Sequence, residues 1–92
     1  MPVSARKLDS LLVNVLGFER RLGRHQTYVL RVGDRQVVRT MLSHGVREIG
    51  DDLLSLMARQ MGITLRQLKL LLDGKLGREH YVEFLREGGR LP

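Results

Sequence analysis

Residues 25–42 read HQTYVLRVGDRQVVRTML, and this stretch decides the fold of the chain. Apolar and polar side chains alternate with a period of two on both sides of Gly33-Asp34, a pair typical of a two-residue hairpin turn. We therefore predict two antiparallel strands, 25–32 and 35–42. The length of the turn determines which side chains share a face of the hairpin, because successive strand residues point to opposite faces.

A two-residue turn predicts one definite register for this hairpin. One face then carries the pairs Val32–Arg35, Leu30–Val37, Tyr28–Arg39 and Gln26–Met41. The opposite face carries Val29–Val38, Thr27–Thr40 and His25–Leu42. The first face is the more apolar, so we expect helices to cover it and to leave His25 on the open face, near two threonines and Arg31. A three-residue loop would instead move His25 to the covered face.

Helical patterns surround the hairpin on both sides. Between the predicted cap Ser4 and Gly17, apolar residues recur at the spacing of one buried helical face: Leu8, Leu11, Leu12, Val15 and Leu16. A short strand, 18–22, follows. After a loop at 43–50, we predict three helices. The first covers 52–61, with Asp51 as its cap. The second begins at a Thr64–Gln67 capping box and ends at Asp73, and the third covers 78–86. The prediction is an α+β fold. Residues 1–64 form an α-β-β-β-α core with a three-stranded antiparallel sheet, and 65–92 add two helices to the same domain.

The composition favours an anionic partner. The net charge is +6, and thirteen of the sixteen basic residues are arginine, whose planar guanidinium binds phosphate or carboxylate through two parallel bonds. Four aromatic residues are too few for a platform that stacks single-stranded bases.

The absence of cysteine excludes disulfides and thiolate metal sites, and we expect no cofactor and no metal. No apolar run approaches the ~18 residues of a membrane helix, so we expect a cytoplasmic protein.

A family resemblance lies in the order of short motifs along residues 5–64. The motifs are Gly17-Phe18, Gly23-Arg24-His25, Ser43-His44-Gly45, Glu48-Ile49-Gly50 and Gly62-Ile63-Thr64. This order resembles the HicA family of toxin mRNA interferases. The resemblance implies a double-stranded-RNA-binding-like fold, metal-independent cleavage of mRNA by the motif histidine, and neutralisation by a HicB-like antitoxin. His25 matches the catalytic histidine and Gly23 the motif glycine. The chain departs from the pattern in Arg24, which replaces the usual Ser or Thr, and in about thirty additional residues.

The residues around His25 suit that chemistry. RNA supplies its own nucleophile, the 2′-hydroxyl, and an imidazole can accept or donate a proton near neutral pH. Arg24, Arg31 and Arg39, with Gly23, are the predicted RNA- and phosphate-binding residues. His44 is a second candidate proton shuttle. We expect His80, in the last helix, to be structural.

Two alternatives remain open from the sequence. Residues 52–73 have the spacing of a helix-turn-helix, in which Thr64, Arg66, Gln67 and Lys69 would face a DNA major groove. Leu65, Leu70 and Leu72 argue against it, because a recognition helix should be polar on that surface. The second alternative is a non-catalytic interaction module whose open sheet face binds an antitoxin or a second copy of the chain.

Overall fold

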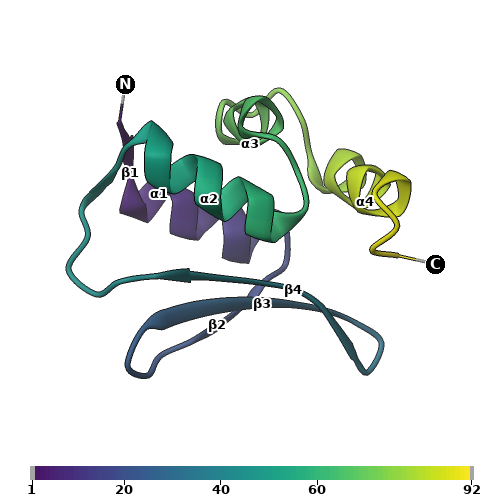
Figure 1. The fold of residues 1–92 in the computed structure, drawn as a ribbon, viewed down its shortest axis with the longest axis horizontal. Helices are drawn as coiled ribbons and strands as arrows, with labels where there is room; N and C mark the ends of the chain where they lie inside the picture. The colour runs from purple at the N-terminus through teal and green to yellow at the C-terminus, as the bar shows by residue number, and fades with distance from the viewer. Residues whose placement is uncertain (1, 92) are drawn as a thin grey trace.

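The computed structural model describes residues 2–91 and shows an α+β fold. A three-stranded antiparallel sheet, in the order β2-β3-β4, has helices on one face, and within the described residues no helix lies on the other (Figure 1). The elements in chain order are β1 (Val3–Ser4), α1 (Ala5–Ser10), the π-helical η1 (Leu11–Val15), β2 (Glu19–Arg21), β3 (Gln26–Val32), β4 (Arg35–Leu42), β5 (Glu48–Ile49), α2 (Asp51–Met61), α3 (Leu65–Leu72) and α4 (Arg78–Glu87).

The predicted N-terminal helix is present, but its second half is a π-helix. Ser4 caps it as predicted, since its hydroxyl accepts a hydrogen bond from the Lys7 amide (3.1 Å). Gly17, with a φ of +79°, ends it in the left-handed conformation that glycine adopts without strain. Val15 was expected on the buried face but is 45% exposed. The wider turn of η1 adds a residue per turn and rotates Val15 outward.

The hairpin has the predicted turn, but its predicted register is wrong beyond the first two pairs. Val32 pairs with Arg35 across Gly33, which has a φ of +64°. An irregularity next to Leu30 then shifts the pairing by one residue, and the pairs become Leu30–Val38, Val29–Arg39, Tyr28–Thr40, Thr27–Met41 and Gln26–Leu42. A β-bulge of this kind places one extra residue in β4.

The bulge reverses the faces of β4 but leaves those of β3 unchanged. Val38, Thr40 and Leu42 are buried, whereas Arg39 and Met41, which we expected on the covered face, are exposed. The change is favourable because Val38, Thr40 and Leu42 take the covered positions that were expected for Val37, Arg39 and Met41, so the Arg39 guanidinium stays in solvent. Thr40 is buried without loss of hydrogen bonding, since its hydroxyl donates to Gln60 Oε1 (2.7 Å).

The helices after the sheet largely match the prediction. The Thr64–Gln67 capping box is present at the start of α3. Asp51 was expected to cap α2, but Gly50 is the cap residue and Asp51 lies in the first helical turn. Acidic side chains are favourable there because the amino end of a helix carries partial positive charge. The short pair β1–β5, which joins Val3–Ser4 to the predicted loop 43–50, was not predicted.

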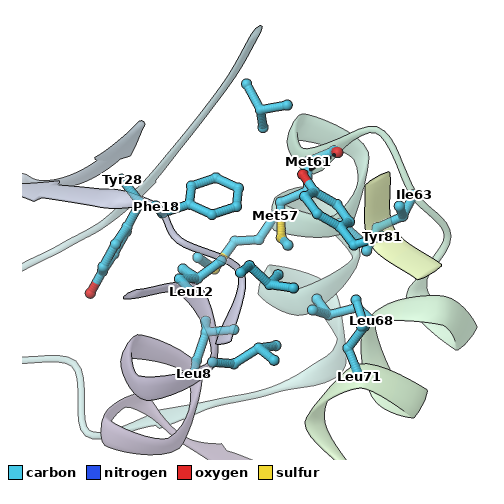
Figure 2. Packing of buried hydrophobic residues seen from close by; sticks show 14 of the residues in the cluster. Leu8, Leu12, Phe18, Tyr28, Met57, Met61, Ile63, Leu68, Leu71 and Tyr81 are labelled. Atoms are coloured by element: carbon cyan, nitrogen blue, oxygen red, sulfur yellow. Dashed lines mark hydrogen bonds between the residues drawn. The ribbon is translucent and has the colours of Figure 1, made fainter. Parts of the chain in front are cut away.

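Residues 65–91 complete the same hydrophobic core as the first sixty-four. Figure 2 shows side chains of α1 and α2 meeting those of α3 and α4 in one cluster. Tyr81 of α4 is fully buried, its ring lies 6.0 Å from that of Phe18, and its hydroxyl donates to the Met61 carbonyl (2.9 Å). Side chains of residues 65–91 and of the sheet and first helices thus pack in one core.

A hydrogen-bonded group centred on Asp9 joins α1 to the sheet. The Asp9 carboxylate accepts from the Tyr28 hydroxyl (2.6 Å), from Arg20 (2.8 Å to Oδ2) and from Gln26 (3.2 Å). Burial acts to raise the pKa of Asp9, but the hydrogen bonds from Tyr28 and Arg20 outweigh it and hold the pKa below its ordinary value. The contacts fix the helix across the edge of the sheet.

Replacing Asp9 with asparagine is expected to lower the free energy of unfolding at neutral pH by about 1–3 kcal/mol, because a charged acceptor of three side chains is lost. Since the folded pKa lies below the unfolded one, this stabilisation is present above about pH 4 and is lost as the pH falls through the folded pKa. Urea unfolding at about pH 7 and about pH 3 measures both effects. A difference between the two proteins that does not shrink in acid would contradict this assignment.

Candidate functional site

A hollow of about 360 Å³ lies on the open face of the sheet, on the side that no helix covers. It is open to solvent, and its walls come from the end of β2, the loop 22–25, β3 and β4. The lining residues are Arg21, Leu22, Gly23, Arg24, His25, Thr27, Val29, Gln36, Arg39 and Met41. Most of the residues that the sequence singled out for function therefore lie in one place.

His25 is exposed and stands directly before the first residue of β3. Its position on the open face was expected, and it follows from the alternation along β3, which the bulge in β4 does not alter. Within residues 2–91 its imidazole makes no hydrogen bond to a protein group. The ring is thus free to meet a ligand in the hollow.

His44 contacts the loop 22–25, which precedes β3. Its Nε2 lies 2.8 Å from the Gly23 carbonyl oxygen. Because a carbonyl oxygen only accepts, Nε2 must carry the hydrogen of this bond. The contact joins the loop after β4 to the loop before β3, and it leaves only Nδ1 of His44 for other partners.

The arginines differ in how far they are neutralised. Glu19 lies 3.3 Å from Arg21 and 3.9 Å from Arg31, so both share its charge. Arg24 and Arg39 line the hollow and have no carboxylate partner within the described residues. Arg31, a predicted phosphate ligand, does not line the hollow. Arg21, which was not among the predicted site residues, does line it, and its pairing opposite Thr27 places it on this face.

Gly23 is not required by the fold. Its φ is not positive, and a Cβ at this position would meet no atom within 4 Å.

Two apolar side chains at the hollow are unusually exposed, Leu22 at 74% and Met41 at 39%. The hollow therefore combines exposed cations, one free imidazole and apolar surface.

The helix-turn-helix alternative finds less support in the geometry. Thr64 and Gln67 hydrogen-bond to each other's backbone in the capping box, and Lys69 forms an ion pair with Asp51 (3.1 Å). Arg66 alone of the four predicted DNA-facing residues has no such partner among the described residues. Leu72 is buried, whereas Leu65 and Leu70 are half-buried.

His80 has a structural role, as expected. Its Nδ1 accepts a hydrogen bond from the Gly77 amide (3.0 Å) at the start of α4. This bond satisfies one of the amide groups that a helix leaves unpaired at its amino end. His80 lies on a different element from the hollow.

Comparisons with protein-family models, with curated proteins and with solved structures found no significant match. Among residues 2–91, no group of three or more His, Cys, Asp or Glu side chains is placed to hold a metal ion. In the same part of the chain, none of the helices combines the length and apolarity that crossing a membrane requires. Any assignment of function therefore rests on the chemistry of the hollow.

Proposed function

We propose that this chain is a metal-independent endoribonuclease of the HicA mRNA-interferase type, acting in the cytoplasm. The observation that carries the proposal is the exposed His25 imidazole in a solvent-open hollow beside Arg24 and Arg39, which have no carboxylate partner among residues 2–91. A proton-transfer group next to phosphate-binding groups is what cleavage of an RNA backbone needs.

The proposed reaction is an internal transesterification. His25 takes the proton of a ribose 2′-hydroxyl, and the oxygen attacks the adjacent phosphorus. The bond from phosphorus to the 5′-oxygen breaks, which leaves a 2′,3′-cyclic phosphate and a 5′-hydroxyl. The leaving oxygen receives its proton from the imidazolium or from water. Arg24 and Arg39 bind the phosphoryl oxygens as negative charge develops on them. Gly23, which has no side chain, leaves room for the RNA strand to approach the loop 22–25.

The arrangement of elements supports a double-stranded-RNA-binding-like fold within this proposal. The order α1-β2-β3-β4-α2, with the helices on one face of the sheet, is the order that the resemblance implied.

Exposed Leu22 and Met41 fit a protein partner that closes the hollow, and a HicB-like antitoxin is the proposed partner. The same apolar surface suits a second copy of the chain.

The test uses the purified chain, EDTA and a single-stranded RNA. We expect cleavage to persist in EDTA and to give 2′,3′-cyclic phosphate ends. The matched substrate carries one 2′-deoxynucleotide at the cleaved position; it should bind equally well and remain uncut there, because its nucleophile is missing. Cutting at the deoxynucleotide, or a complete loss of activity in EDTA, would show that a different chemistry operates.

A further inference from the structure

The loop 22–25 has little packing to hold it in place. Its four residues, Leu22, Gly23, Arg24 and His25, are all exposed. A Cβ at Gly23 would meet no atom within 4 Å, so no side chain packs against the loop on that side. A short exposed loop of this kind moves readily unless a specific contact restrains it.

The contact that restrains it comes from His44. The Nε2 of His44 donates to the Gly23 carbonyl oxygen at 2.8 Å, two residues before His25. Both the neutral Nε2–H tautomer and the imidazolium can donate this bond. A proton shuttle at Nε2 would have to break the contact in every turnover.

We infer that His44 is a positioning residue, which holds the loop 22–25 so that the His25 imidazole faces the hollow. The inference rests on the proposed ribonuclease function for its effect on rate. It assigns to His44 a role different from the second proton shuttle that the sequence suggested. His44 is not among the residues that line the hollow.

Two amide variants separate positioning from proton transfer. His44→Gln carries an N–H close to the position of Nε2, whereas His44→Asn carries one close to the position of Nδ1 and falls short of Gly23. Neither side chain can shuttle protons. Ser43→Ala, at an exposed neighbouring position, is the matched control and should cleave at the wild-type rate.

We expect His44→Asn to lower kcat about 10- to 100-fold with little change in KM, since small misplacements of a catalytic group have effects of this order. His44→Gln should stay within about threefold of wild type, in line with a retained hydrogen bond. The shape of the pH–rate profile should be the same in both variants. If His44→Gln is as slow as His44→Asn and loses one limb of the profile, His44 is a proton shuttle. If both variants match wild type, His44 has no role in the reaction.

A second measurement does not depend on cleavage. The ¹⁵N heteronuclear NOE of the Gly23, Arg24 and His25 amides should fall in His44→Asn and remain at its wild-type level in His44→Gln. Equal values in the two variants would overturn the positioning role even in an active enzyme. If instead the wild type cuts no RNA while the NOE values differ, the proposed function fails and the restraint of the loop by His44 stands.

Discussion

Replacing Tyr81 with alanine is expected to lower the free energy of unfolding by about 3–5 kcal/mol, the range for a large aromatic residue in a core. Tyr81 is fully buried, packs near Phe18 and donates its hydroxyl hydrogen to the Met61 carbonyl. The change removes the ring, leaves a cavity where α4 meets the core, and deprives the carbonyl of its donor. Domains of this size have a stability of only about 5–15 kcal/mol. Urea unfolding followed by circular dichroism should therefore show a large fall in the midpoint.

Two further variants of α4 serve as controls for the loss of stability expected in Tyr81→Ala. Tyr81→Phe keeps the ring and removes one hydrogen bond, so it should cost about 0.5–1.5 kcal/mol. Phe84→Ala removes a side chain that is only half-buried, and its effect should be smaller than that of Tyr81→Ala. A Tyr81→Ala protein with wild-type stability would mean that residues 65–91 are not part of the folding unit.

The parts of the fold that could be predicted are those decided by local sequence. The Gly33-Asp34 turn, the Thr64–Gln67 capping box and the Ser4 cap depend on residues within three or four positions of each other, and all three are present. The helical periods after the sheet also predicted α2, α3 and α4, which have buried residues at helical spacing.

The register of β4 could not be predicted from the same pattern. Val37 and Val38 are both apolar, so either one can begin the buried set of the strand. The choice is made by the helices that cover the sheet, which favour Val38 and Leu42 over a set that contains Arg39. The two-residue strands β1 and β5 are too short to carry any alternation, and the apolar spacing of residues 8–16 fits an α-helix as well as the π-helical turns of η1.

In the candidate site, too, the features decided by local sequence could be predicted and those decided by contacts between distant residues could not. The placement of His25 on the open face follows from the alternation along β3, which the bulge in the neighbouring strand does not alter. The contact of His44 with Gly23 joins residues twenty-one positions apart, and its geometry arises only when both loops are folded. Arg21 was passed over because its face depends on its pairing with β3.

Replacing His25 with alanine is expected to reduce the rate of RNA cleavage about 10²- to 10⁴-fold, the usual contribution of one positioned acid–base group. The side chain is exposed, so the substitution should leave the free energy of unfolding nearly unchanged. RNA affinity should also change little, because the arginines that bind phosphate remain. Initial rates on a fluorogenic RNA strand, with binding measured at the same salt concentration, separate the two quantities.

The openness of the hollow allows a chemical rescue of the same variant. Free imidazole should enter the space vacated by His25, since the hollow holds about 360 Å³ and opens to solvent, and it should restore part of the lost rate. His80→Gln is the matched control, because glutamine can still accept the Gly77 amide hydrogen and His80 lies away from the hollow. Undiminished cleavage by His25→Ala would remove His25 from the mechanism. A loss of rate without rescue, accompanied by a loss of binding, would instead indicate that the imidazole holds the RNA strand and does not transfer a proton.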